Sequence, residues 1–444
     1  MSDEVLDFQL VRSLQAQIAD EMTAHKQRRE LRGERELSNQ DERQMALSLM
    51  HAAVSRHMQG RLERGLELPD ASYDQRLVEA IDAAMYRAGE LQSLLDDDLV
   101  ENIDINGADE VWITYADDRG KVRGRPVAAG DEDLINIIQT LGAYAGLNAR
   151  PFTRASPELD LRLQDGSRLS AVLGASERPV VSIRRNRFPQ MFLPMLVEFG
   201  TVDEQSAAFL RAAVLARANI MVAGATDAGK TTLLRALINC IPTGERLVTV
   251  ERAIELSLRR HPELHHDVVE LEEVLPDSDG NGGLTIRQLV RRTRRQNPSR
   301  VCVGEVLGPE VVEMLSAMSQ GNNGSLSTIH ARNAADVFQK LATYGAQYEG
   351  LDFPVTHSLI ASSIDFVVFI AKNRRLGGRR CVVEIVEVAG ENDGRVSQSR
   401  IFVPSPVDGR AVRDPEVPII RSQDLAAAGY DDTAGGGWAA ADWA

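Results

Sequence analysis

Residues 224–231, GATDAGKT, constrain the fold more than any other segment of the sequence. An apolar run at 218–223, which predicts a buried strand, precedes this segment, and residues with the apolar spacing of a helix follow it. A glycine-rich turn between a strand and a helix turns backbone amides and a helix N-terminus toward phosphate oxygens. The sequence therefore predicts a phosphate-binding loop in an α/β domain.

Each position of this loop has an expected task in binding ATP. Gly224 and Gly229 let the backbone curl, Lys230 is expected to contact the β- and γ-phosphates, and the Thr231 hydroxyl is expected to ligate Mg²⁺. Asp227 is unexpected because a carboxylate repels phosphate, so we expect its side chain to face solvent. The predicted nucleotide-binding residues of the loop are Gly224, Ala225, Thr226, Asp227, Ala228, Gly229, Lys230, Thr231 and Thr232.

Three later segments resemble strands that end in a polar side chain. Residues 246–251, RLVTVE, end in Glu251, residues 300–305, RVCVGE, end in Glu305, and residues 321–330, GNNGSLSTIH, end in His330. Because parallel strands carry ligands at their carboxyl ends, we expect these three side chains to lie beside the phosphate loop. Two acids and an imidazole could position water, bind a metal and sense the γ-phosphate.

The chain of 444 residues is too long for one hydrophobic core. Residues 1–75 are rich in charged residues and predict solvated helices, and residues 76–198 show the mixed pattern of an α+β domain. Residues 199–404 carry the phosphate loop and form the predicted ATPase domain. Residues 405–444, rich in Asp, Gly and Ala, predict a disordered tail.

Composition argues against several classes of protein. The net charge of −15 disfavours nucleic acid as the main partner, and the three separated cysteines indicate neither a disulfide framework nor a zinc site. No apolar run is long enough to insert directly into a membrane, so we expect a cytoplasmic protein that reaches the membrane through partners. The arginine-rich stretch 287–300 leaves DNA translocation open as an alternative.

Residues 100–390 resemble the type II/type IV secretion ATPase superfamily, and most closely its CpaF-like branch, which powers Tad/Flp pili. The resemblance rests on the phosphate loop and on five further stretches. These are IDINGADEVWI at 103–113, SPELDLRLQDGSRLSAV at 156–172, VTVERAIEL at 248–256, NPSRVCVGEVLGPE at 297–310 and GSLSTIHARNAADVFQKL at 324–341.

The resemblance implies a fold and a set of roles. It implies a RecA-like P-loop ATPase domain, preceded by a smaller α+β domain and a helical extension, assembled as a homo-hexamer on an inner-membrane platform protein. Glu251 would orient or deprotonate the attacking water, Glu305 would act through the metal and His330 would sense the γ-phosphate. The α+β domain would supply arginines toward the nucleotide, and the candidates by position are Arg154, Arg162 and Arg168.

Two positions depart from the family pattern. Arg252 stands where a second acid usually follows Glu251, and Leu307 stands where an arginine usually follows the Glu-Val pair at 305–306. An ATP-binding regulator with little hydrolysis is therefore a second alternative. A metabolic kinase is disfavoured because no lid or acceptor-site motif follows the phosphate loop. Pilus extension, pilus retraction and secretion share one motor chemistry, so the sequence does not separate them.

Overall fold

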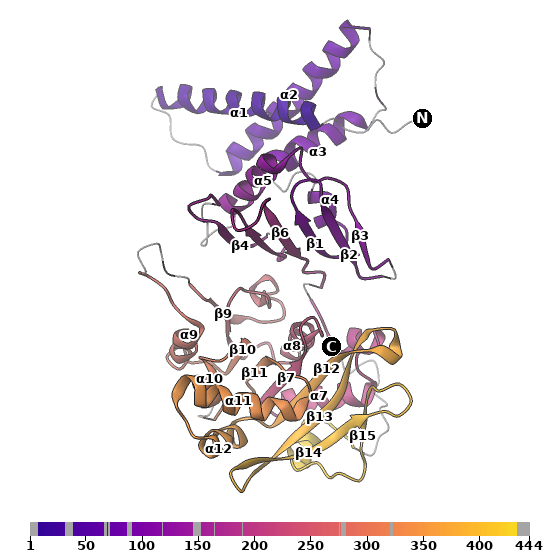
Figure 1. Ribbon diagram of the computed structural model, residues 1–444, viewed down its shortest axis with the longest axis vertical. Coiled ribbons are helices and arrows are strands. Elements are labelled where there is room, and N and C mark those ends of the chain that lie inside the picture. Colours follow the sequence, from indigo (N-terminus) through magenta and orange to yellow (C-terminus); the bar gives the residue numbers. More distant parts are fainter. Residues whose placement is uncertain are drawn as a thin grey trace. The chain divides into compact units, whose positions relative to one another are not determined.

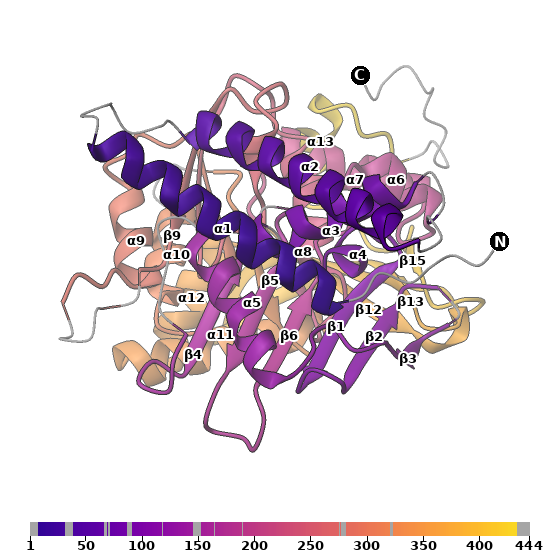
Figure 2. The same ribbon diagram turned by 90° about the horizontal axis from the view of Figure 1, so that it is seen from above.

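The computed structural model describes residues 8–31, 39–65, 69, 72–86, 91–117, 119–144, 152–163, 165–188, 190–274, 276, 281–319 and 323–432. The chain divides into two compact units. We call residues 1–187 the N-terminal unit and residues 188–444 the C-terminal unit, and each is described separately (Figures 1 and 2).

The N-terminal unit begins with three helices that share one apolar core. The helices are α1 (Phe8–Leu31), α2 (Asn39–Glu63) and α3 (Tyr73–Tyr86). Ile18, Met50, Leu77 and Ile81 are fully buried between them. The predicted solvated extension is therefore wrong in one respect, because α1 and α2 pack against each other and against α3. The predicted boundary at residue 75 falls inside α3.

A six-stranded antiparallel sheet completes the described part of the N-terminal unit. Its order is β3-β2-β1-β6-β5-β4, and α5 shares its core. Its elements are α4 (Leu91–Leu95), β1 (Val100–Asn106), β2 (Val111–Tyr115), β3 (Lys121–Arg123), α5 (Asp131–Tyr144), β4 (Glu158–Arg162), β5 (Arg168–Val172) and β6 (Val180–Arg184). Alternation of buried and exposed residues in β4 to β6 gives the sheet one apolar face.

The described part of the C-terminal unit is built on a nine-stranded mixed sheet in the order β15-β14-β13-β12-β7-β11-β10-β8-β9. Its strands are β7 (Ile220–Gly224), β8 (Arg246–Glu251), β9 (Asp267–Glu272), β10 (Arg300–Val306), β11 (Leu326–His330), β12 (Phe366–Asn373), β13 (Arg379–Asn392), β14 (Arg395–Pro404) and β15 (Ala411–Arg413). Its helices are α6 (Leu193–Glu198), α7 (Glu204–Leu215), α8 (Lys230–Ile238), η2 (Leu258–Arg260), α9 (Ile286–Thr293), α10 (Val311–Ser319), α11 (Ala334–Glu349), α12 (Phe353–Ser363), η3 (Arg374–Leu376) and α13 (Ser422–Ala427).

Helices cover both faces of this sheet. The six strands from β12 to β9 are parallel, and β7, which is buried at every residue, has the continuous apolar run of a strand covered on both faces. Along β7, Ile220 and Val222 belong to the core formed with α6, α7 and α8, whereas Met221 and Ala223 belong to the core formed with α9 to α12. Because the strands are parallel, β7, β8, β10 and β11 all end at the same edge of the sheet.

Two predicted boundaries of the C-terminal unit need correction. The unit begins near Phe188 rather than at residue 199, because α6 packs against α7 and α8 and the Asn239 side chain donates to the Met191 carbonyl at 2.8 Å. The predicted tail from residue 405 is ordered as far as residue 432, where β15 and α13 lie. Its buried apolar side chains, among them Ile419, Leu425 and Tyr430, suffice because they join the existing core around Phe209. Residues 433–444 lie outside the described residues.

No described helix is both long enough and apolar enough to cross a bilayer.

Substitution of Tyr430 tests whether this C-terminal segment belongs to the folded body. The Tyr430 ring meets the Phe209 ring edge to face at 5.4 Å, and only 6% of the residue is exposed. Tyr430→Ala should lower the free energy of unfolding by about 3 kcal/mol, because a large buried side chain leaves a cavity. Tyr430→Phe, which keeps the ring, should cost much less. Equal unfolding midpoints for parent and Tyr430→Ala in scanning calorimetry would show that the segment is not packed.

Candidate active site

The phosphate loop joins β7 to α8 with two residues in the left-handed backbone region. These are Gly229, at φ 97°, and Asp227, at φ 60°. Helix α8 begins at Lys230, and its N-cap residue Gly229 contributes no side-chain bond. The first-turn N–H groups of a helix lack partners within the helix, so this end of α8 is suited to bind an anion.

Gly224 is required for a reason that differs from the expected one. Its backbone is not left-handed, but a Cβ atom at this position would lie 2.3 Å from the Ile370 carbonyl oxygen on β12. The residue is therefore glycine because the neighbouring strand leaves no room for a side chain.

Lys230, His330 and Glu305 form a continuous chain of contacts. The Lys230 ammonium lies 3.0 Å from the Ala225 carbonyl oxygen and 3.1 Å from His330 Nδ1. His330 Nε2 in turn lies 2.7 Å from Glu305 Oε1. Three side chains from three elements, α8, β11 and β10, thus meet at the carboxyl edge of the parallel sheet.

The surroundings of His330 favour its neutral form. Burial lowers the pKa of His330, the Glu305 carboxylate opposes that shift, and the nearby Lys230 and Lys340 ammonium groups add to it. A neutral imidazole has one donor and one acceptor nitrogen. Because an ammonium can only donate and a carboxylate accepts, Nδ1 accepts from Lys230 and Nε2 donates to Glu305.

Glu251, at the end of β8, is buried and only partly satisfied. Its Oε1 accepts hydrogen bonds from the backbone N–H groups of Glu255 at 3.0 Å and Leu256 at 3.1 Å. Its Oε2 is buried and has no hydrogen-bond partner in the described part of the chain. Burial raises the pKa of Glu251 to about 8, against the two hydrogen bonds, which lower it. The side chain lies against Gly304, where a Cβ atom would approach Glu251 Cγ to 2.8 Å.

The residues present at this edge fit a magnesium ion that is held mainly by phosphate. Thr231 lies in the first turn of α8, and Glu305 stands on β10 with a half-buried side chain. Among the described residues, no group of three or more His, Cys, Asp or Glu side chains could hold a metal. Mg²⁺ in nucleotide sites usually has one or two protein ligands together with phosphate oxygens and water, so this donor set is of the right kind.

Comparison with known proteins identifies the family. The model of the family "Type II/IV secretion system protein" matches residues 86–400. The Mycobacterium tuberculosis (strain H37Rv) protein named "Putative conjugal transfer protein Rv3659c" is 36% identical over 324 residues, covering 71% of this chain and 88% of the relative. This chain belongs to the type II/IV secretion system protein family. Like the ATPases of that family, it is an ATP hydrolase.

Two VirB11 proteins are also similar to this secretion ATPase. Protein VirB11 of Agrobacterium fabrum is 28% identical over 308 residues, which covers 62% of this chain and 85% of that protein. The crystal structure of the VirB11 ATPase of the Brucella suis type IV secretion system matches with a TM-score of 0.36 and 25% identity, covering 68% of this chain and 96% of that one. The family match over residues 86–400 and the Mycobacterium tuberculosis relative confirm the predicted superfamily, whereas its CpaF-like branch stays a prediction.

We expected from the sequence that the Asp227 side chain would simply face solvent, but in the structure it is paired with two cations. Its carboxylate pairs with Lys372 at 2.5 Å and with Arg380 at 2.8 Å, on the strands β12 and β13. Sequence reasoning missed these two cations. The signal was present in AKNRRLGGRR at 371–380, a glycine-containing turn dense in basic residues between two apolar strands. The two positive charges explain how a carboxylate is accommodated beside a phosphate loop.

The arginines predicted from the N-terminal unit lie on or next to its sheet. Arg154 stands in the tight turn between Thr153 and Ser156. Arg162 and Arg168 are cross-strand partners, and Arg168 also pairs in register with Arg184 of β6. Directly opposed residues point to the same face of a sheet, so these three arginines form a row. Arg184 was missed, although it ends the alternating run VVSIR at 180–184.

The two departures from the family pattern have different surroundings. Arg252 is exposed and its Nε donates to Glu273 at 3.2 Å. Leu307 follows the end of β10, and its N–H donates to the buried carboxylate of Glu310, which also accepts from the Gly308 N–H at 3.3 Å. At each of the two positions the residue therefore forms a hydrogen bond with a nearby glutamate, Glu273 for Arg252 and Glu310 for Leu307.

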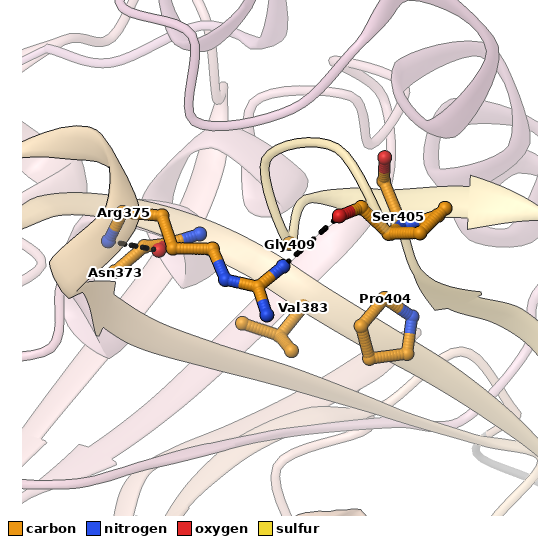
Figure 3. Close-up of a pocket in the computed structure, with 7 residues that line it drawn as sticks. Asn373, Arg375, Val383, Pro404, Ser405 and Gly409 are labelled. Atoms are coloured by element: carbon orange, nitrogen blue, oxygen red, sulfur yellow. Dashed lines mark hydrogen bonds between the residues drawn. The ribbon is translucent and has the colours of Figure 1, made fainter.

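A separate cavity lies beside the hairpin formed by β12 and β13. Its volume is about 370 Å³, and it is lined by Asn373, Arg375, Val383, Pro404, Ser405, Pro406 and Gly409 (Figure 3). Arg375 donates to the Pro406 carbonyl at 3.1 Å. None of the predicted site residues lines this cavity, so we do not assign it to the nucleotide.

The raised pKa of Glu251 predicts how stability depends on pH. The pKa of the Glu251 carboxyl group rises from 4.5 to about 8 on folding. At pH values between 4.5 and 8 the folded protein therefore binds more protons at this group than the unfolded chain does. Stability should therefore fall as the pH rises from 5 to 8, by a few kcal/mol at most.

Glu251→Gln should flatten this decline because an amide does not ionise. The measurement is the thermal midpoint of both proteins from pH 5 to 8. Glu416→Gln, the same change of charge on an exposed residue, serves as the control. If the parent and Glu251→Gln lose stability in parallel, Glu251 is not the group responsible.

Proposed function

We propose that this ATP hydrolase is a motor that drives Tad/Flp-type pilus assembly, or type II/IV-like secretion, through a membrane platform protein. The observation that carries the proposal is the contact chain from Lys230 through His330 to Glu305, beside the buried Glu251. A loop lysine, two acids and a histidine at one sheet edge are the groups that binding and cleaving a γ-phosphate requires.

Each side chain has a proposed role in the reaction. Lys230 and the first turn of α8 bind the phosphates, and the residues of the loop from Gly224 to Thr232 surround them. Thr231 and Glu305 would hold Mg²⁺, which when bound neutralises charge on the phosphate oxygens. Glu251 orients the attacking water and accepts its proton once ionised. His330 lies between the lysine and the metal-binding acid, so it is placed to respond to the γ-phosphate.

The sheet order supports a RecA-like P-loop domain, because the strand of the phosphate loop, β7, lies between two parallel strands, β12 and β11, and is the middle strand of the nine-stranded sheet of the described residues. The arginine row of the N-terminal unit gives Arg162, Arg168 and Arg184 a common face. We propose that these residues and Arg154 approach the nucleotide within a homo-hexamer, with the ring on the cytoplasmic side of the inner membrane. Closure of the N-terminal unit over ATP would then be transmitted to the platform protein.

One observation keeps DNA translocation as a second candidate. Arg291 and Arg292 at the end of α9, with Arg294 and Arg295 just after it, have exposed side chains that together make a basic surface. Phosphate backbones bind to such surfaces. The same arginines could instead face an acidic neighbouring subunit. Absence of any effect of DNA on the rate of ATP hydrolysis would remove this candidate.

The test of the motor is steady-state ATP hydrolysis with Mg²⁺ by the parent, Lys230→Ala and Glu305→Gln, with mass photometry of the same samples. We expect turnover by the parent and a loss of at least about 100-fold in both variants, because each removes charge stabilisation of the transferred phosphate. A six-subunit species favoured by ATP should appear in the parent.

The exposed Lys121→Ala variant, in the N-terminal unit, is the control for a lost lysine charge. Tight ATP binding by the parent without turnover would contradict the motor and favour an ATP-binding regulator. Turnover that survives in Lys230→Ala would show that the phosphate loop is not the site of hydrolysis.

A further inference from the structure

A basic hairpin lies against the phosphate loop. It joins the end of β12 to the start of β13, and residues 371–380, AKNRRLGGRR, contain five cations and no acid. Because β12 runs parallel to β7, the hairpin emerges at the same sheet edge as the phosphate loop.

Two of its cations point toward the tip of the loop. Lys372 and Arg380 are directly opposed in the register of β12 and β13, so their side chains share a face. Lys372 Nζ lies 2.5 Å from Asp227 Oδ2, and Arg380 Nη2 lies 2.8 Å from Asp227 Oδ1. Arg380 Nε also donates to the Asp227 backbone carbonyl at 3.0 Å. Arg380 therefore binds both the side chain and the backbone of one loop residue.

Packing fits the hairpin to the loop on either side of this contact. A Cβ atom on Gly229 would lie 3.3 Å from Arg380 Cδ, and one on Gly224 would overlap the Ile370 carbonyl oxygen at 2.3 Å. The backbone of Asp227 is left-handed, at φ 60°, which costs energy for any residue except glycine. Bonds to both its carbonyl and its carboxylate can stabilise that conformation.

We propose that Asp227, Arg380 and Lys372 form a tie that holds the phosphate loop in its phosphate-binding shape, with Arg380 as the principal positioning residue. The tie has one negative and two positive charges, so the loop tip stays net positive toward an anionic ligand. This inference rests on the proposed function only in that the loop binds the phosphates of ATP. It adds that the affinity for ATP depends on a strand hairpin outside the loop.

The test measures how Arg380 and Asp227 depend on each other. A fluorescent ATP analogue with Mg²⁺ is titrated into the parent, Arg380→Ala, Asp227→Gly and the double variant. Arg380→Ala should raise Kd about tenfold in the parent but less than about threefold in the Asp227→Gly background, where its carboxylate partner is gone. In steady state the KM should rise while kcat changes by less than about twofold, because the tie positions the loop and contacts no reacting atom.

Two further variants separate the tie from charge and from misfolding. Arg379→Ala removes a neighbouring exposed cation of the hairpin and should leave Kd within about twofold of the parent. Arg380→Lys keeps the charge but loses the forked geometry, so its Kd should lie between those of parent and Arg380→Ala. If Arg380→Ala has a lowered thermal midpoint, Arg380→Lys replaces it in the comparison of Kd values with the parent.

Three results would contradict the proposed tie. An equal effect of Arg380→Ala in both backgrounds, no effect in either, or an equal effect of Arg379→Ala would overturn the tie while leaving ATP binding by the parent intact. Failure of the parent to bind the analogue would overturn the proposed function, and this inference with it.

Discussion

The contact of His330 with both Lys230 and Glu305 is the interaction on which the rest of the site depends. It joins the phosphate loop, the end of β11 and the end of β10 through distances of 3.1 and 2.7 Å. A parallel sheet brings these ends to one edge, and the helices on both faces keep the strands buried. Since one imidazole ring accepts from Lys230 at Nδ1 and donates to Glu305 at Nε2, His330 links the two contacts directly.

The two glutamates differ because their surroundings differ. Glu305 contacts a histidine and is partly exposed, whereas Glu251 is buried against Gly304 with one oxygen unpaired and a pKa raised to about 8. Two acids in unlike environments can take unlike roles, one as a ligand for a cation and the other as a base that must first lose its proton.

The sequence predicted the parts of the site that lie in continuous motifs. The loop at 224–231 and the strands that carry Glu251, Glu305 and His330 at or next to their last residue could be found because each pattern is local. Long-range contacts could not be found in this way: Asp227 meets Lys372 and Arg380 about 150 residues later, through strand register. The tail was mispredicted for a similar reason, since Leu425 and Tyr430 are buried by a core built elsewhere in the chain.

The most direct test of the central claim is a structure of the protein with Mg²⁺ and a non-hydrolysable ATP analogue. We expect the Lys230 ammonium to contact phosphate oxygens in place of His330 Nδ1, with Thr231 and Glu305 directed toward the metal. A nucleotide bound away from residues 224–232, with the contacts from Lys230 through His330 to Glu305 unchanged, would contradict the claim that these residues form the active site.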